Sequence, residues 1–184
     1  QSCTADTATT IAASYGNVGC TLEQDGTTVL RKTVSAYAIP AGASPYIVDR
    51  KFQTAVYNAS GYLLSLSNQF YDGAAAASTA PTIGELTRST GYFDIPANTS
   101  STTGITLHGS DTVTDYDAYG NTTTTTTYSG SSTRLFNGTS TTWGAVSGTA
   151  RTVTTTYDTT FRVFATQESN PLGDVTKADY DERM

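Results

Sequence analysis

The chain is poor in the residues that most catalytic and metal sites use. Its 184 residues include one histidine, two cysteines, one tryptophan and one methionine. The single histidine, His108, has no serine in a Gly-X-Ser-X-Gly turn to pair with, so a Ser-His-Asp triad is not predicted. One histidine and two cysteines also fall short of the four ligands of a typical zinc site. We therefore predict that the chain is not an enzyme and holds no cofactor or metal.

Charged residues are scarce as well, at 14% of the chain, and the formal net charge is −6. The few lysines and arginines are scattered and form no basic patch, so the chain lacks the positive surface that nucleic acid or an anionic membrane would attract. No uninterrupted apolar run approaches the length of a membrane span. We expect neither a nucleic-acid partner nor a membrane span.

The chain is instead rich in threonine, with 12 tyrosines and 16 glycines. Tyrosine and threonine favour extended backbone, and glycine favours turns. No segment of about a dozen residues shows the apolar spacing of an amphipathic helix. The sequence therefore predicts an all-β fold, an antiparallel strand meander with a loop, or alternatively a short Ala-rich turn of helix, at 73–84. Strands are expected near residues 27–39, 46–56, 62–70, 86–93, 105–108, 112–116, 122–128, 151–157 and 161–167, with a final strand towards Tyr180.

Turn chemistry is the most informative local feature of the sequence. In Asp115-Tyr116-Asp117-Ala118-Tyr119-Gly120-Asn121, Asp117 can open a four-residue turn through its side chain, and Gly120 can close it with a positive φ. Similar residues recur downstream. We expect structural turns built from Tyr116, Asp117, Gly120, Asn121, Tyr157, Asp158, Asn170, Gly173, Tyr180 and Asp181.

The aspartates are also candidates for metal ligands and for catalytic acids. Asp111, Asp115 and Asp117 are spaced like calcium-loop ligands, but no distal glutamate of the EF-hand type follows them. Turn hydrogen bonds are the better explanation of Asp115 and Asp117. Asp94 and Asp158 likewise lie beside turns, so a carboxylate pair for glycoside hydrolysis has no further support in the sequence.

These units resemble the RHS/YD-repeat family, whose repeats carry a Tyr-Asp pair, a glycine followed by Asn or Arg, and a β-rich run. Tyr71-Asp72-Gly73 with residues 84–88, and residues 156–161 with 170–173, are also similar to segments of the shell-forming proteins of tripartite insecticidal toxin complexes. The resemblance covers roughly residues 27–184. It carries over no catalytic position, because the family's self-cleaving protease region is not recognisable in this chain.

The resemblance implies a β-strand spiral that closes into a hollow shell around a sequestered polypeptide. A chain of 184 residues is too short to enclose a protein cargo alone. The implied partners are therefore the remainder of a larger shell, or copies of the chain itself joined through strand edges.

The beginning of the chain differs from the rest. We divide the chain into an N-terminal segment, residues 1–26, and a YD-repeat-like β domain, residues 27–184. Both cysteines, Cys3 and Cys20, fall in the first segment, where a disulfide would staple the terminus in an oxidising compartment; two buried free thiols are the alternative. No basic leader precedes Gln1, so any secretion signal was removed or was never part of the chain. We expect a secreted or cell-surface protein.

Four Asn-X-Ser/Thr sequons add possible N-glycosylation sites, which would carry glycans on exposed turns in a secreted eukaryotic or archaeal protein and would mean little in a bacterial one. They are Asn58, Asn98, Asn121 and Asn137.

Together these features predict a non-enzymatic, secreted β-structural module, either part of an RHS/YD-type shell or a self-associating, fibre-like extracellular assembly. The principal alternative is a carbohydrate-binding or adhesive β-sandwich, which would expose a Tyr or Trp platform, for example at Trp143. The third hypothesis is a small secreted hydrolase, which would show perturbed carboxylates converging in a cleft.

Overall fold

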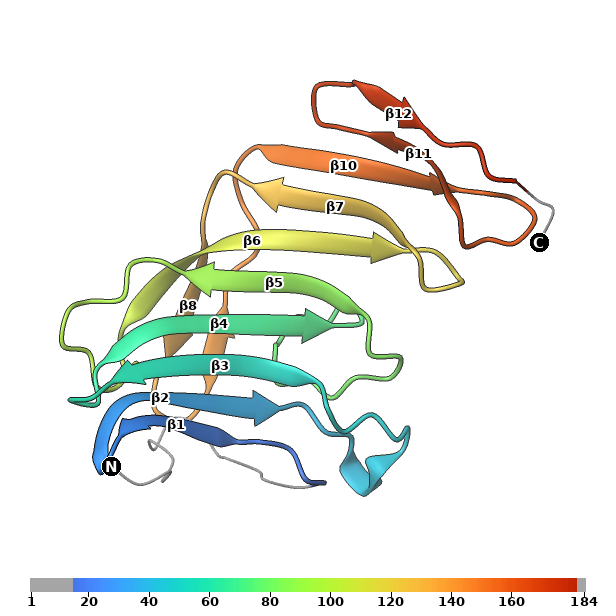
Figure 1. Ribbon diagram of the computed structural model, residues 1–184. Helices are drawn as coiled ribbons and strands as arrows, with labels where there is room; N and C mark the ends of the chain where they lie inside the picture. The colour runs from blue at the N-terminus through green and yellow to red at the C-terminus, as the bar shows by residue number, and fades with distance from the viewer. Residues whose placement is uncertain (1–14, 182–184) are drawn as a thin grey trace.

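The computed structural model describes residues 15–181, which fold into one antiparallel sheet (Figure 1). One short 3-10 helix, η1, spans Ala41–Ala43. The strands are β1 (Cys20–Asp25), β2 (Thr28–Tyr37), β3 (Lys51–Asn58), β4 (Leu63–Tyr71), β5 (Leu86–Tyr92), β6 (Thr106–Tyr116), β7 (Thr122–Tyr128), β8 (Ser132–Phe136), β9 (Thr141–Trp143), β10 (Ala150–Tyr157), β11 (Ala165–Ser169) and β12 (Val175–Lys177).

The strands follow chain order with one excursion. The path runs β1-β2-β3-β4-β5-β6-β7-β10-β11-β12, while β8 pairs with β6 and with β9. In Figure 1 the sheet twists from β1 at the bottom to β12 at the top, and the β8–β9 hairpin passes behind β4 and β5. The predicted all-β antiparallel meander is confirmed. Within residues 15–181, no helix has the length and apolar character that crossing a bilayer requires.

Two expected strands at residues 105–108 and 112–116 are one continuous strand, β6. Gly109 lies in its middle and pairs with both Tyr92 of β5 and Ser132 of β8. A Cβ at Gly109 would lie 2.4 Å from Cγ2 of Thr90, so this glycine permits close packing of strands and does not interrupt the strand.

The expectation of a strand over residues 161–167 was wrong at its beginning, because β11 begins at Ala165. The backbone N–H groups of Phe161, Val163 and Phe164 donate to the Asp158 carboxylate and are not part of a strand ladder. Strands β1, β8 and β9 were not predicted. The last two are short and form a hairpin in which β8 also pairs with β6.

A small apolar core lies between β2 and β6 on one face of the sheet. Val34, Ala55 and Leu66 are lateral neighbours on β2, β3 and β4. Four further residues complete the cluster: Tyr57, Leu63, Tyr92 and Leu107. All seven are at most 8% exposed. By contrast, β10, β11 and β12 contain no fully buried residue, so the C-terminal end of the sheet is thinly covered.

The expected boundary between residues 26 and 27 falls in the turn that joins β1 to β2, which pair in the same sheet from Cys20↔Val34 to Asp25↔Thr28. Cys20 opens β1, and the described part of the chain has no free cysteine. Cys3 lies outside the described residues, so its pairing with Cys20 remains a prediction.

Candidate functional site

A tyrosine lies at the end of every second strand along the continuous path of the sheet, or a few residues beyond it. At the end of β4, the Tyr71 hydroxyl donates to the carbonyl of Lys51, the first residue of β3, at 2.8 Å. At the end of β6, Tyr116 donates to Leu86, the first residue of β5, at 3.0 Å. Five tyrosines make such bonds, and we call them the tyrosine row: Tyr37, Tyr71, Tyr116, Tyr157 and Tyr180, with the carbonyls of Val18, Lys51, Leu86, Thr122 and Ala165 as acceptors.

After Tyr71 and Tyr157, an aspartate organises the loop that leads to the next strand. Asp72 accepts backbone N–H groups from four consecutive residues, 82–85, immediately before β5. Asp158 accepts them from Thr160, Phe161, Val163 and Phe164, immediately before β11. Backbone donors that have no strand partner are therefore satisfied by a single carboxylate.

Asp117 belongs to a second, shorter kind of turn that occurs three times. In each, the side-chain oxygen of an Asx residue accepts N–H groups two and four residues later, and a glycine N–H donates to the Asx carbonyl. The glycines, Gly61, Gly120 and Gly173, have φ of 83°, 83° and 88°, which confirms the positive φ expected of Gly120. The turns begin at Asn58, Asp117 and Asn170.

These hydrogen bonds change the acidity of the capping carboxylates. Desolvation raises the pKa of Asp158, but the backbone N–H groups together outweigh it and lower the pKa to about 2. The pKa of Asp72 is lowered in the same way, against desolvation. At Asp117 the Asn121 side-chain bond lowers the pKa most, with a smaller contribution from Arg162. All three carboxylates are therefore held ionised as hydrogen-bond acceptors.

Neighbouring loops at these ends of the strands also contact one another. Nε of Arg50, which lies just before β3, donates to the Gly84 carbonyl in the next loop at 3.0 Å. The Asn121 amide donates to the Arg162 carbonyl, and the Arg162 guanidinium lies 5.6 Å from the centre of the Tyr119 ring. Arg162 has a left-handed φ of 62°, a conformation that these contacts and the Asp158 bonds on either side hold in place.

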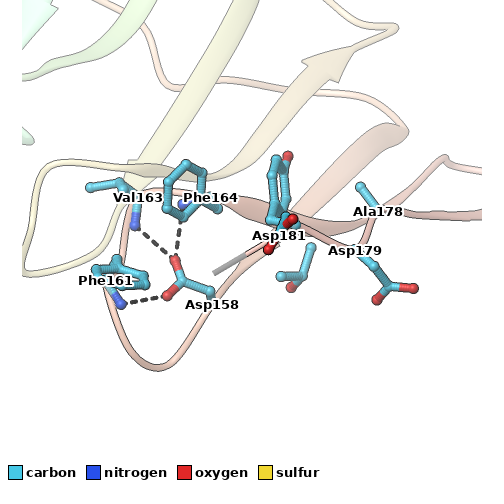
Figure 2. Close-up of a pocket in the computed structure, with 9 residues that line it drawn as sticks. Asp158, Phe161, Val163, Phe164, Ala178, Asp179 and Asp181 are labelled. Atoms are coloured by element: carbon cyan, nitrogen blue, oxygen red, sulfur yellow. Dashed lines mark hydrogen bonds between the residues drawn. The ribbon is translucent and has the colours of Figure 1, made fainter. Parts of the chain in front are cut away.

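A cavity of about 320 Å³ lies where the last of these loops meets the segment after β12 (Figure 2). The Phe164 and Tyr180 ring centres are 4.9 Å apart, and Phe161 meets Phe164 edge to face at 5.9 Å. Asp158, Asp179 and Asp181 also line the cavity. We call this the terminal pocket. It brings together three predicted turn residues, Asp158, Tyr180 and Asp181.

The four sequons have different surroundings. Asn98 and Asn137 are exposed, and the Asn137 side-chain oxygen accepts N–H groups from Thr139 and Ser140. Asn58 is half-buried and caps its own turn. At Asn121 the side-chain nitrogen donates to Asp117 and to Arg162, so both of its hydrogens are used.

The other candidate ligands do not converge. Asp111 is buried against Arg88, whereas Asp115 accepts the Thr124 hydroxyl and Asp117 caps its turn. Among residues 15–181, no group of three or more His, Cys, Asp or Glu side chains could hold a metal ion. The His108 ring lies within hydrogen-bond distance of Asp94, which also accepts the His108 backbone N–H.

One face of the sheet contains a row of buried polar residues that was not predicted. Gln53, Asn68, Thr90 and Asp111 are lateral neighbours on β3, β4, β5 and β6, and all are buried. Asp111 accepts from the Thr90 hydroxyl at 2.6 Å and from Arg88 Nε at 2.9 Å. We call these four residues the interior polar row. Period-2 alternation marks them as inward-facing, but polar type alone suggests solvent.

Arg134 of β8 reaches the interior polar row from the covering hairpin. Its guanidinium is near Thr102 and Gln53, at 3.3 and 3.4 Å, and lies 5.5 Å from the Trp143 ring centre. Phe70 meets the same tryptophan edge to face at 5.3 Å. Trp143 is thus packed between the hairpin and the sheet, and its ring offers no open platform for a sugar.

Comparison with protein-family models, curated proteins and solved structures gave no match to this chain.

Proposed function

We propose that this chain is a non-enzymatic β-structural module of a secreted or cell-surface protein, whose sheet is continued at the β12 edge by another strand. That strand belongs to the remainder of an RHS/YD-type shell or to a copy of the chain. The observation that carries the proposal is the tyrosine row, because the same closing bond recurs from Tyr37 on β2 to Tyr180 after β12. The same contact therefore recurs along the sheet once for every two strands, as in a repeat protein.

The outer edge of β12 supports strand addition. Within the described residues, β12 pairs with β11 alone. The Ala178 N–H donates to the Thr166 carbonyl at 3.0 Å, and hydrogen bonding alternates along an antiparallel strand. The N–H and C=O of Lys177 therefore point away from β11. All three residues of β12 are exposed, so this edge presents backbone groups that a partner strand can satisfy.

The carboxylates favour a structural role over a hydrolytic one. A general acid needs a raised pKa at neutral pH. The aspartates with a resolved change have lowered pKa values; in Asp94, as in Asp72 and Asp158, hydrogen bonds outweigh an opposing desolvation. Each of them accepts backbone N–H groups at a turn or strand end.

Hydrogen–deuterium exchange of native material and of the isolated chain tests the proposal. In native material we expect the outward amides of Val175 and Lys177 to be protected, because a partner strand covers them. In the isolated chain these amides should exchange quickly, while the inward amide of Ala178 stays slower. Rapid exchange at Lys177 in native material would refute strand addition at this edge. Hydrolysis abolished by one carboxylate substitution would instead favour an enzyme.

A further inference from the structure

Asn137 differs from the other asparagines of the chain in the residue that follows it. The chain has seven asparagines, all within the described residues, and Asn137 alone precedes a glycine. Both residues are exposed in the turn between β8 and β9. Within residues 15–181 the Gly138 N–H makes no hydrogen bond. The Gly138 nitrogen is therefore accessible, and no Cβ shields it.

The turn also polarises the side-chain carbonyl of Asn137. Its Oδ1 accepts the backbone N–H groups of Thr139 at 3.0 Å and of Ser140 at 2.8 Å. The hydroxyls of the same two residues donate to it at 3.0 and 3.4 Å. Donors that converge on a carbonyl oxygen stabilise the negative charge that develops there when a nucleophile adds to the carbon. The nearest nucleophile along the chain is the Gly138 nitrogen, whose attack closes a five-membered ring.

We propose that Asn137 is a self-modification site, at which the Gly138 nitrogen attacks the side-chain amide carbon while the turn donors stabilise the charge on Oδ1. The new C–N bond forms, the bond to the side-chain nitrogen breaks, and the Gly138 proton reaches the leaving ammonia through solvent. The product is a succinimide. Water then opens the ring, at the side-chain carbonyl to give aspartate or at the main-chain carbonyl to give isoaspartate. Water is the only co-reactant.

The two products have different effects on the hairpin. Each adds one negative charge to the formal net charge of −6. Aspartate keeps a side-chain acceptor for the turn N–H groups, as Asp117 does in its own turn. Isoaspartate directs the main chain through the side-chain carbon and so lengthens the turn. Because Phe136 and Thr141 pair directly across this turn, isoaspartate should loosen the end of the β8–β9 hairpin.

Peptide mapping of the unglycosylated chain, expressed in bacteria, tests the proposal. The chain is incubated at neutral and mildly alkaline pH, and mass spectrometry with electron-transfer fragmentation measures deamidation and isoaspartate at each asparagine. Asn98 is the matched control, because it is also exposed but is followed by Thr99, whose N–H donates to the Pro96 carbonyl at 3.3 Å. We expect conversion at Asn137 that accelerates as the pH rises, since the attacking amide must lose its proton, and none at Asn98 over the same time.

Two variants test the donors of the turn. Thr139→Val removes a hydroxyl donor and keeps the N–H, so it should slow conversion about two- to tenfold, the range of one hydrogen bond expressed as a rate. Ser140→Ala removes the longer hydroxyl bond and should slow conversion less. Fluorescence of Trp143, the only tryptophan, checks that the hairpin still packs against Phe70 in each variant.

Conversion at Asn137 no faster than at Asn98 would overturn the proposal. This comparison needs no substitution, so it holds even if a variant misfolds. An unchanged rate in Thr139→Val with the hairpin in place would refute stabilisation by the turn donors. Neither outcome bears on strand addition at β12, which the exchange of Lys177 tests separately.

Discussion

Removing hydroxyl groups from the tyrosine row should destabilise the sheet while leaving its rings in place. The variant we choose replaces Tyr71, Tyr116 and Tyr157 by phenylalanine, which deletes the bonds to the carbonyls at the beginnings of β3, β5 and β7. Each bond joins a different pair of strands. The change therefore tests whether the tyrosine row holds neighbouring strands together.

The expected loss of stability follows from the one hydrogen bond that each substitution removes. A typical bond contributes about 0.5 to 1.5 kcal/mol, and Tyr71, at 6% exposure, belongs at the upper end because its acceptor is poorly hydrated. The three sites lie two strands apart, roughly 10 Å, so their effects should add to about 3 kcal/mol. For a chain of 184 residues this corresponds to a Tm lowered by about 6 to 12 °C.

Urea and thermal unfolding followed by circular dichroism measure the change. Tyr128→Phe is the matched control, because Tyr128 ends β7, is half-buried and makes no hydroxyl bond to the other described residues. We expect this control to change the free energy of unfolding by a few tenths of a kcal/mol at most. If the triple variant is no less stable than Tyr128→Phe, the tyrosine row does not hold neighbouring strands together.

Three further outcomes are expected. Because the pKa of Asp158 is about 2 when folded and near 3.8 when unfolded, its contribution to stability is present above pH 3.8 and is lost as the pH falls towards 2; acid titration of Asp158→Asn should show a shallower loss. Gly120→Val should cost about 1 to 2 kcal/mol through backbone strain alone, since φ is 83° and nothing lies near its Cβ, whereas Gly91→Val, equally open but without a positive φ, should be tolerated in a urea melt. Expression in a glycosylating host should give higher glycan occupancy at Asn137 than at Asn121 by mass spectrometry, and the reverse order would contradict the assigned amide contacts.

The sequence was most informative where backbone chemistry is local. The Asp117 to Gly120 turn follows from residue types whose side chains and φ preferences act within four positions, and the same spacing recurs from Asn58 to Gly61. The residues Asn58-Ala59-Ser60-Gly61 also predict that second turn, and the same asparagine belongs to a sequon. Composition predicted the all-β class, and the succession of strand and turn signals along the chain predicted the antiparallel meander.

Long-range polar contacts could not be predicted. Asp111 has the sequence neighbours of a turn aspartate, yet it lies buried in β6, paired with Thr90 of β5 and in contact with Arg88. The same holds for Arg134, whose partners Gln53 and Trp143 come from β3 and β9. Such placements depend on which strands become neighbours, and no local propensity encodes that. The tyrosine bonds were missed for the same reason, because each acceptor lies 15 to 35 residues away.

The tyrosine row also solves a problem that the threonine-rich strands create. Residues 122–127 of β7 are all threonine, so a slip by two residues would leave most residue types in its pairs with β6 and β10 unchanged. Register must then be set at the strand ends. The Asp117 turn fixes β7 against β6, and the Tyr157 bond to the Thr122 carbonyl fixes β10 against β7. A slip of about 7 Å would break both contacts. The register of each strand thus depends on contacts with the strand before it. Beyond β12, the Tyr180 bond to the Ala165 carbonyl fixes the chain in the same way, so a strand that added there would meet an edge in a fixed position.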